Sequence, residues 1–367
     1  MQIVSRAGLA AGLRRALSGQ GCIGVVPQER PEPYLAMLAP DEPLEHPEAA
    51  IAIATSGSTG NPKGVLLSAA AVEFMVAATH DFLGGPGHWV CALPVHHIAG
   101  FMTLARGVVS GLGTSFADPS LVEPLPELGG FARKYISLVP AQLLKALAAA
   151  PASEWLAGFD AILLGGSAIP EGLVERAAQA GLRVVITYGM SETCGGCVYD
   201  RYPLAGVELG FEPVDGGQRL TIASPGNFLS YRLDPEATRQ VLEDGRVRTR
   251  DLGYLRGGKL YVTGRLDDVV VSGGENVDLA QAQAVADRLL GPEVLALLDV
   301  PDARFGARIV AATTSAAPDA ELLALLGGQL ERAAMPKEIR RVGSLPRNPG
   351  GKIDRASLRK EFDGDGR

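Results

Sequence analysis

Apolar residues in the first half of the chain fall into two alternating patterns. Short continuous runs such as "AIAIA" (50–54) and "AILL" (161–164) are typical of buried strands. In "SAAAVEFMVAATHDFL" (68–83) and "EGLVERAAQAG" (171–181), apolar residues lie three and four apart, as on one helix face. Strands that alternate with helices predict an α/β protein with a parallel sheet. Ligands of such sheets bind beyond the carboxyl ends of the strands, where this chain places glycine-rich and polar segments.

The pattern changes near residue 205, where short alternating runs separated by "DGG" and "RGG" predict β-hairpins. Farther along we expect a helix over 278–290, strands over 294–299 and 308–313, a helix over 318–332, and a polar tail. About 100 residues are enough for a separate domain. The sequence therefore predicts a large N-terminal domain over 1–265 and a small α+β C-terminal domain over 266–367.

Composition and charge narrow the classes of function. Of the 367 residues, 47% are hydrophobic and 20% are charged, which is typical of a globular protein in water. The formal net charge is −7 and no sustained basic block occurs, which argues against a nucleic-acid partner. The N-terminus does not have the pattern of a secretory signal, and no apolar run is long enough to span a membrane. We therefore expect a cytoplasmic protein.

The spacing of cysteines and histidines gives little indication of a metal site. None of the five histidines pairs with another in a metal-ligand pattern. Cys194 and Cys197 form a CxxC, which is compatible with a redox pair or half of a zinc site. Because no second CxxC is present, we favour two small residues in a glycine-rich turn, "TCGGC".

The segment "TSGSTGNPKG" (55–64) has the composition of an anion-binding loop. Its glycines let the backbone approach a phosphate, its hydroxyls donate hydrogen bonds, and Lys63 adds a positive charge. It is not a Walker A loop, because Pro62 precedes the lysine and Gly64 follows it. A flexible surface loop is disfavoured, since the segment directly follows a strand that looks buried.

Six segments, in the same order, resemble the motifs of the adenylate-forming superfamily of acyl- and aryl-CoA synthetases, peptide-synthetase adenylation domains and luciferases. "TSGSTGNPKG" is similar to the phosphate loop of that family. The other segments are "ALPVHHIAG" (92–100), "YGMSET" (188–193), "RTRDLG" (248–253), "GRLDDVVVSGGENV" (264–277) and "NPGGKIDR" (348–355). The resemblance covers about residues 50 to 355. It implies the adenylate-forming fold, with a large domain of parallel sheets, helices and hairpins and a small mobile domain.

The resemblance also implies a two-step reaction. A carboxylate attacks the α-phosphate of ATP and gives an acyl-AMP and pyrophosphate, and the thiol of coenzyme A then displaces AMP. ATP and Mg²⁺ are the implied cofactors, with coenzyme A as co-substrate. Because the first step brings negative oxygens together, it needs positive charge where that charge builds up.

The matching positions imply a nucleotide site. Glu192 would hold Mg²⁺, a cation that prefers carboxylate and phosphate oxygens, and Thr193 would lie near the α-phosphate. Asp251 would accept hydrogen bonds from the ribose and Arg265 would contact ribose or phosphate, although Arg250 replaces the usual glycine of this motif. The residues expected around the β- and γ-phosphates are Thr55, Ser56, Gly57, Ser58, Thr59, Gly60 and Lys63. Those expected around the adenine and the rest of the AMP are Gly165, Gly166, Ser167, Tyr188 and Gly189.

The last motif implies a catalytic lysine, Lys352, which would bridge the carboxylate and the α-phosphate as a point charge. Lys352 and Lys63 lie in different predicted domains, so the resemblance implies a domain rotation between the two half-reactions. Asp267 matches the hinge position of the family. After the rotation, Ser272, Gly273 and Gly274 would line the path of the pantetheine arm.

The short N-terminal part and the segments "YGMSETCGGCVYD" and "SGGEN" most resemble the compact o-succinylbenzoate–CoA ligases of high-GC bacteria, which act in menaquinone synthesis. Their substrate is an aromatic dianion, so its pocket should hold a buried cation beyond the catalytic groups. Arg106, nine residues after His97, is the expected contact, with Lys134 and Arg201 as weaker candidates. His97 would wall the acyl pocket and His96 would hydrogen-bond the substrate.

Three other interpretations stay open. The chain could be another aryl- or fatty-acyl-CoA ligase, an adenylation enzyme that loads a carrier protein, or a nucleotide-binding protein without catalysis. The presence of Glu192, Asp251, Arg265 and Lys352 argues against the last of these. The expected partners are small molecules, and a homodimer is a further expectation because dimers are common in the family.

Overall fold

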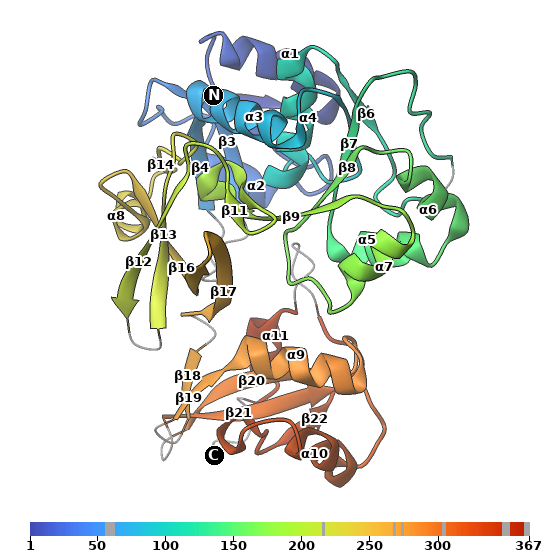
Figure 1. Cartoon of the computed structure of the whole chain (residues 1–367). Helices are drawn as coiled ribbons and strands as arrows, with labels where there is room; N and C mark the ends of the chain where they lie inside the picture. The colour runs from blue at the N-terminus through green and yellow to red at the C-terminus, as the bar shows by residue number, and fades with distance from the viewer. Residues whose placement is uncertain are drawn as a thin grey trace.

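A computed structural model of the chain describes residues 1–55, 63–122, 124–214, 217–266, 269–272, 275–302, 306–346 and 353–362. Within these ranges the strands form four sheets, and helices pack on the first, the second and the fourth (Figure 1). The first three sheets contribute buried residues to one core, the third of them being a hairpin unit, and the fourth sheet belongs to the C-terminal part. No helix in the described ranges is long and apolar enough to cross a membrane.

The first sheet has the order β1-β2-β3-β4-β14. Its strands are β1 (Gln2–Val4), β2 (Ile23–Val25), β3 (Ala49–Thr55), β4 (Lys63–Ser68) and β14 (Ser230–Tyr231). The first three strands are parallel, whereas β4 runs antiparallel to β3 and to β14. Thr55 is paired with Lys63. The expected phosphate loop therefore joins two antiparallel strands, and no helix follows it directly.

Two helices connect the parallel strands, α1 (Arg6–Leu17) and α2 (Glu32–Leu38). The proline-rich pattern of residues 27–47 gave no indication of α2. This helix begins directly after Pro31 and has Pro33 in its first turn, where the missing N–H group has no intrahelical partner to lose.

The second sheet has the order β11-β10-β9-β8-β7-β5-β6. Its strands are β5 (His88–Cys91), β6 (Thr114–Phe116), β7 (Lys134–Leu138), β8 (Ala161–Leu164), β9 (Val184–Met190), β10 (Gly195–Tyr199) and β11 (Tyr202–Pro203). The five strands β5 to β9 are parallel, which confirms the predicted parallel sheet. β10 and β11 extend it as an antiparallel edge, and the 3₁₀ turn η1 (Ser191–Thr193) joins β9 to β10.

Helices cover both faces of the second sheet. On one face lie α3 (Ala69–Leu83) and α4 (Ile98–Ser110), whose apolar residues share a core with α1 and the first sheet. On the other face lie α5 (Pro140–Leu147), α6 (Ala150–Leu156) and α7 (Leu173–Gln179), which form a separate apolar cluster. Because α4 is packed between the second sheet and the helices α1 and α3, one face of it can reach β10 and the end of β9.

The third sheet is antiparallel, as the glycine-rich turns predicted. Its strands are β12 (Glu208–Val214), β13 (Gly217–Ala223), β15 (Leu242–Glu243), β16 (Arg246–Arg256) and β17 (Lys259–Arg265), and α8 (Pro235–Val241) precedes β15. Gly257 and Gly258, at the turn between β16 and β17, have φ angles of 58° and 75°. Such a two-residue turn needs positive φ at both positions, which glycine adopts without strain.

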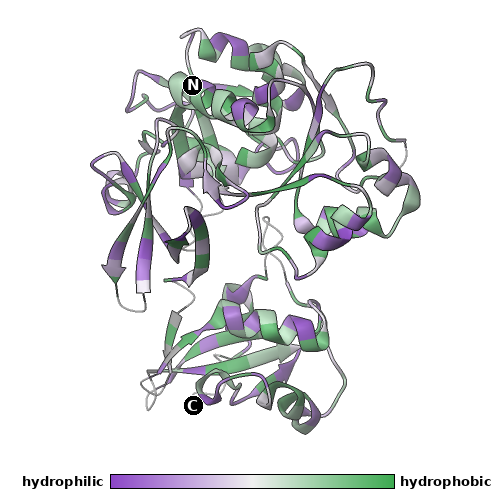
Figure 2. Ribbon diagram, in the orientation of Figure 1, coloured by the Kyte–Doolittle hydropathy of each residue, from purple (hydrophilic) through white to green (hydrophobic). Residues whose placement is uncertain are grey.

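The fourth sheet has the order β19-β18-β21-β20, and β22 pairs with β21. Its strands are β18 (Val269–Ser272), β19 (Glu275–Asp278), β20 (Leu295–Asp302), β21 (Gly306–Thr313) and β22 (Ile339–Arg341). Its helices are α9 (Leu279–Leu290), α10 (Asp319–Gly327) and α11 (Arg355–Arg359), with a 3₁₀ turn η2 (Arg332–Ala334). Two apolar clusters made only of residues from 270 onward cover its faces, and Figure 2 shows β20 and β21 mainly as hydrophobic.

The C-terminal part differs from the sequence-based expectation in two details. The helix expected over 318–332 ends at Gly327, and η2 follows it. The expected polar tail contributes β22 and α11, whose Leu358 packs against β20. Both elements are short and polar on their outer side, so their sequence carries little periodic signal. The predicted domain boundary stays a prediction, since Asp267 lies outside the described residues.

Candidate active site

Three of the expected nucleotide-binding side chains lie together where β9 meets the third sheet. The hydroxyl of Tyr188, on β9, donates a hydrogen bond to Oδ2 of Asp251 on β16. Nη1 of Arg265 lies 2.8 Å from Oδ1 of the same carboxylate. Burial and the adjacent Asp251 carboxylate raise the pKa of Tyr188, so the phenol stays protonated and serves as a donor.

The hairpin of β16 and β17 explains part of this arrangement. Its register places Asp251 opposite Arg265, and residues opposite each other in an antiparallel pair have side chains in contact. Asp251 is 5% exposed. The Asp251 carboxylate accepts from two donors, Tyr188 and Arg265. Its oxygens can accept further hydrogen bonds from the hydroxyl groups of a ligand.

Glycines allow β8, β9 and β10 to approach closely at this edge. A Cβ atom on Gly165 would lie 2.3 Å from Oγ1 of Thr187, and one on Gly189 would lie 2.0 Å from the carbonyl oxygen of Gly195. Gly166 has a φ angle of +85°, which disfavours other residues. Ser167 is exposed next to them. Packing alone therefore requires Gly165 and Gly189, apart from any contact with a nucleotide.

A second group of polar residues lies around Glu192 in η1. The hydroxyl of Tyr231, on β14, is 2.5 Å from Oε1 of Glu192. Nζ of Lys63 is 4.6 Å from the centroid of the Tyr231 ring and 3.6 Å from Oδ2 of Asp234. Glu192, Lys63 and Asp234 therefore surround one tyrosine. Ser56, Gly57, Ser58, Thr59 and Gly60, which the sequence placed in the same region, lie outside the described residues.

Thr193 is fully buried behind Glu192. Its Oγ1 accepts a 3.0 Å hydrogen bond from the N–H of Met190 and donates one of 2.9 Å to the carbonyl oxygen of Gly195. These contacts close the turn that presents Glu192. The contact between Thr193 and the α-phosphate stays a prediction.

One face of α4 runs from His97, at its start, toward the interior. Ile98, Met102 and Arg106 are four residues apart and so lie along one side of the helix. This side faces β10 and the turn before it. A Cβ atom on Gly195 would lie 3.3 Å from Met102, and Sγ of Cys194 lies 3.5 Å from Sδ of Met102. Burial raises the pKa of Cys194 to about 12, so this thiol stays protonated.

Arg106 lies at the inner end of this face and is 4% exposed. Its Nη2 donates a 3.2 Å hydrogen bond to the hydroxyl of Tyr199, and its guanidinium carbon lies 4.8 Å from the centroid of the Trp89 ring. Within the part of the chain that the structure describes, its Nε has no hydrogen-bond partner and no carboxylate forms an ion pair with it. A buried guanidinium without a carboxylate is energetically unfavourable until an anion reaches it.

Histidines border the same region. The rings of His96 and His97 are 4.3 Å apart, and the ring of Tyr34, from α2, meets His96 edge-on at 5.3 Å. Burial lowers the pKa of both histidines, and the neighbouring His97 helps to bring that of His96 to about 4. Both rings are therefore neutral near pH 7. The N-terminal part thus contributes Tyr34 to the region that the sequence assigned to the acyl substrate.

A family model for AMP-binding enzymes matches residues 9–226, which is more than half of the chain. The chain belongs to the AMP-binding enzyme family. This identification agrees with the arrangement of Tyr188, Asp251 and Arg265 and confirms the resemblance that the sequence motifs indicated.

Individual relatives of this AMP-binding enzyme are named as CoA ligases or CoA synthases. It is 38% identical to a probable 2-succinylbenzoate–CoA ligase of Mycobacterium tuberculosis, over 97% of this chain and 96% of that protein. It is 28% identical to a 2-succinylbenzoate–CoA ligase of Enterococcus faecalis, over 90% of this chain and 73% of that protein. A feruloyl-CoA synthase of an Amycolatopsis species is 30% identical, over 88% and 72% of the two chains.

Solved structures confirm the predicted adenylate-forming fold. The o-succinylbenzoate CoA synthetase of Bacillus subtilis in complex with its acyl-adenylate intermediate has a TM-score of 0.75 and 25% identity, with 95% of this chain and 80% of that chain covered. ATP-bound MatB of Rhodopseudomonas palustris has a TM-score of 0.77 and 20% identity, with coverage of 99% and 96%.

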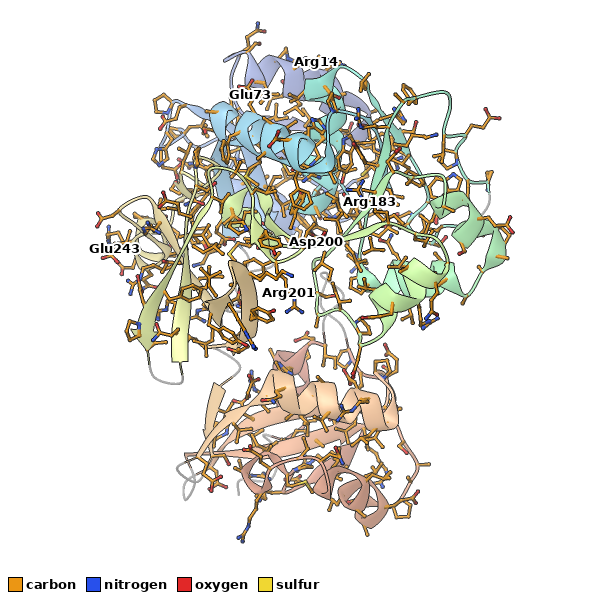
Figure 3. The ribbon with its side chains drawn as sticks, viewed as in Figure 1. Arg14, Glu73, Arg183, Asp200, Arg201 and Glu243 are labelled. Atoms are coloured by element: carbon orange, nitrogen blue, oxygen red, sulfur yellow. The ribbon has the colours of Figure 1, made fainter. Side chains whose placement is uncertain are left out.

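The two weaker cation candidates, Lys134 and Arg201, occupy other positions in the fold. Lys134 begins β7 and is therefore at the amino end of a parallel strand, opposite the ligand edge. Arg201, in the turn between β10 and β11, packs 4.5 Å from the centroid of the Tyr261 ring (Figure 3).

Of the small-domain candidates, Ser272 is buried at the end of β18. Asp267, Gly273, Gly274 and Lys352 lie outside the described residues.

Sequence reasoning missed Tyr231 and Asp234, which contact the candidates Glu192 and Lys63. The segment "DPEAT" (234–238) signalled only a helix start, and Asp234 does cap α8 by accepting from the N–H of Ala237. The motifs did not indicate that this cap also faces Lys63. A contact between segments that lie far apart in the chain has no local pattern in the sequence.

Proposed function

We propose that this enzyme is an AMP-forming o-succinylbenzoate–CoA ligase of menaquinone synthesis. The observation that carries the proposal is Arg106, a buried cation without a carboxylate among the described residues, at the inner end of the α4 face that starts at His97. If one carboxylate of an aromatic dicarboxylate contacts Arg106, its other carboxylate would be directed toward the nucleotide. The similarity to curated 2-succinylbenzoate–CoA ligases supports the same substrate.

The nucleotide is assigned to the residues around β9. Asp251 would accept hydrogen bonds from the ribose hydroxyls, with Arg265 beside it, while Tyr188, Gly165, Gly166, Ser167 and Gly189 would surround the adenine. The supporting feature is the buried Asp251 carboxylate, which both Tyr188 and Arg265 orient. Two fixed donors hold its rotamer, so the ribose meets an oriented acceptor.

The phosphates are assigned to Thr55, Lys63 and the loop 56–60, and Glu192 is the proposed magnesium ligand. Glu192 has two carboxylate oxygens, and among the described residues Tyr231 donates a hydrogen bond to one of them, Oε1. The other oxygen, Oε2, has no such donor among these residues, so it suits a hard cation. Bound Mg²⁺ would supply positive charge to the phosphate oxygens. Lys63 adds a further charge from the strand that follows the loop, and Thr193 keeps the turn of Glu192 closed.

The second half-reaction is assigned to a rearranged small domain. We propose a large domain over 1–265 and a small one over 266–367, with Asp267 as hinge. Lys352 would bridge the carboxylate and the α-phosphate during adenylation. Ser272, Gly273 and Gly274 would line the coenzyme A path afterwards. Because ATP and coenzyme A are cytoplasmic metabolites, we place the enzyme in the cytoplasm. We also propose a homodimer, and light scattering can measure its mass.

The deciding experiment measures pyrophosphate release with ATP, Mg²⁺ and coenzyme A for o-succinylbenzoate, benzoate, ferulate, a medium-chain fatty acid and an amino acid. We expect strong preference for o-succinylbenzoate and formation of its coenzyme A thioester. Turnover of benzoate or ferulate alone would indicate an aryl-CoA ligase, and use of a carrier protein but not coenzyme A would indicate a loading enzyme. In K352A, release of pyrophosphate should fall far more than thioester formation from supplied acyl-AMP.

A further inference from the structure

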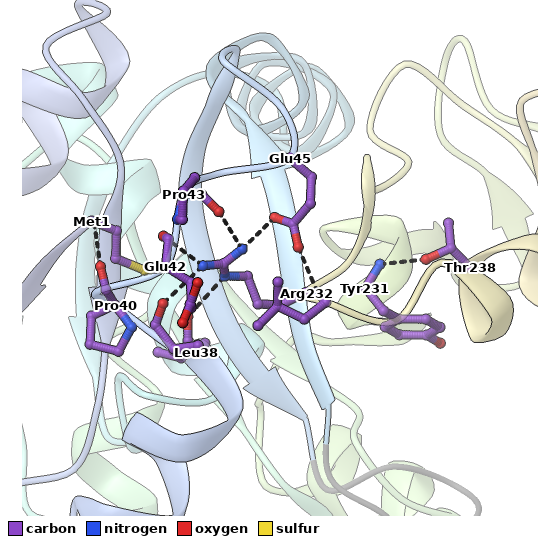
Figure 4. A network of polar contacts seen from close by, with 11 residues as sticks. Met1, Leu38, Pro40, Glu42, Pro43, Glu45, Tyr231, Arg232 and Thr238 are labelled. Atoms are coloured by element: carbon purple, nitrogen blue, oxygen red, sulfur yellow. Dashed lines mark hydrogen bonds and ion pairs between the residues drawn. The ribbon is translucent and has the colours of Figure 1, made fainter.

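Arg232, directly after β14, has every donor of its guanidinium occupied. Its side chain is 0% exposed. Nε donates to the carbonyl oxygen of Leu38 at 3.0 Å, Nη2 to those of Ala39 and Glu42 at 2.8 Å, and Nη1 to that of Pro43 at 2.8 Å and to Oε2 of Glu45 at 2.6 Å (Figure 4). A guanidinium has five N–H groups, and these five bonds use all of them.

All five acceptors lie between the end of α2 and the residues before β3. One arginine therefore ties the segment 38–45 to the chain that follows β14. Glu45 completes the tie, because its Oε1 accepts a 2.6 Å hydrogen bond from the N–H of Leu233. Burial alone would raise the pKa of Glu45, but the hydrogen bonds from Leu233 and Arg232 outweigh it and lower the pKa, so this carboxylate stays charged.

The residues on either side of Arg232 contact the phosphate end of the site. Tyr231 donates to Glu192, and Asp234 lies 3.6 Å from Nζ of Lys63. The N–H of Arg232 itself donates to the carbonyl oxygen of Gly64 at 2.7 Å. A Cβ atom on Gly64 would lie 2.9 Å from Cβ of Arg232, so only glycine fits beside it. The position of Arg232 thus sets the distance of Tyr231 and Asp234 from β4.

We infer that Arg232 is a positioning residue for the phosphates of MgATP: by fixing residues 231–234 against the segment 38–45, it holds Tyr231 on Glu192 and Asp234 on Lys63. The inference rests on the proposed function, which assigns the magnesium and phosphate roles to Glu192 and Lys63. AMP has neither the β- nor the γ-phosphate. Loss of the Arg232 hydrogen bonds to the segment 38–45 should therefore weaken binding of MgATP but not of AMP. A purely structural role would weaken binding of both nucleotides alike.

The test uses the full chain and equilibrium binding of MgATP and of AMP, measured by calorimetry. In R232M we expect the dissociation constant of MgATP to rise about tenfold, as for the loss of one hydrogen bond to a charged group, and that of AMP to stay within about twofold. R232K should resemble R232M, because lysine has three donors in place of five. E45Q should weaken MgATP binding less, since an amide oxygen can still accept one of the two bonds.

Two controls separate this effect from loss of stability. R239M removes an exposed arginine of α8 that pairs with Glu236, and I51V creates a small defect in the buried core of the first sheet. Neither should change the ratio of the two dissociation constants. An unchanged ratio in folded R232M and E45Q would overturn the inference, as would equal weakening of AMP binding. If R232M does not fold, E45Q decides alone.

The binding assay needs no acid substrate. A wild-type protein that binds MgATP but turns over no acid would contradict the proposed function while the ratio test still decides on Arg232. A wild-type protein that does not bind MgATP would overturn both.

Discussion

Tyr231 and Glu192, 39 residues apart in the chain, are joined by a hydrogen bond of 2.5 Å that links the first sheet to the turn after β9. Burial and the nearby Glu192 carboxylate raise the pKa of Tyr231, so the phenol remains a donor over the working pH range. A partner that holds one carboxylate oxygen also fixes the direction of the other. The bond therefore orients the proposed magnesium ligand.

Removal of this hydroxyl should change the magnesium requirement. In Y231F we expect the Mg²⁺ concentration for half-maximal pyrophosphate release to rise about tenfold, because Glu192 loses a charge-assisted hydrogen bond. The KM for the acid should stay unchanged, since Tyr231 lies on the phosphate side. Y254F is the matched control, because the ring of Tyr254 is exposed and stacks on Tyr261. An unchanged Mg²⁺ dependence in Y231F would show that the bond does not orient Glu192.

Replacement of Arg106 should change the choice of acid. In R106M we expect the KM for o-succinylbenzoate to rise about 100-fold, because the second carboxylate loses its charged partner in a buried site. The KM for ATP should not change, and benzoate should be used at least as well as by the wild type. R14M, which removes an exposed arginine of α1 (Figure 3), is the control. Undiminished use of the dianion by R106M would contradict the substrate assignment.

R106M should also differ from the wild type in how ligand changes its thermal stability. The buried guanidinium of Arg106 has no carboxylate among the described residues, so R106M without ligand should melt at the same temperature as the wild type or higher. Added o-succinylbenzoate should raise the melting temperature of the wild type but not of R106M, since a ligand stabilises only the form that binds it. Differential scanning fluorimetry measures both. Equal stabilisation of the two proteins would place the acid elsewhere.

Asp251 should matter for AMP and ATP alike, in contrast to Tyr231. In D251N the dissociation constant of AMP should rise about tenfold or more, because Arg265 and the ribose lose a charged acceptor. Calorimetry with AMP measures this change. E208Q is the control, since Glu208 is an exposed acid of the same sheet that pairs with Arg246. Wild-type affinity for AMP in D251N would show that the ribose is bound elsewhere.

Local patterns in the sequence account for much of the fold and part of the site. Strand and helix periodicity predicted the parallel sheet, and the "RGG" turn fixed the hairpin that sets Asp251 opposite Arg265. The spacing of Ile98, Met102 and Arg106 could have shown that the arginine shares a face with apolar residues. The motif match supplied Glu192 and Lys63 as candidates for one region, and the structure brings both to Tyr231.

The remainder depends on contacts between distant segments. Nothing near Tyr231 indicates that β14 joins the first sheet beside β4, yet this pairing sets its distance from Glu192. The helix α2 lies in a proline-rich stretch, and its Tyr34 reaches His96 only through tertiary packing. Four of the five acceptors of Arg232 are backbone carbonyls, which any residue type supplies. Such contacts leave no residue pattern that periodicity or motif spacing could detect.

Stability should fall as the pH is lowered from about 6.5 toward 4. Burial, with a smaller effect of Arg106, lowers the pKa of His80 to about 4, and its Nε2 accepts a 3.1 Å hydrogen bond from Nε1 of Trp89. In the unfolded chain His80 has its ordinary pKa near 6.5. Between these values the unfolded state binds a proton that the folded state does not. Stability is therefore complete above about pH 6.5 and decreases below it, by at most about 1.4 kcal/mol per pH unit for each such group.

Urea unfolding at several pH values between 4.5 and 8 measures this dependence. H80Q should flatten it, because glutamine does not titrate and its amide oxygen can accept the bond from Trp89. His96, whose pKa burial also lowers to about 4, should keep a residual slope in that variant. H46Q is the control, since the His46 side chain is 33% exposed and lies beside Glu48 at the surface. A slope in H80Q equal to that of the wild type would mean that His80 does not stay neutral in the folded protein.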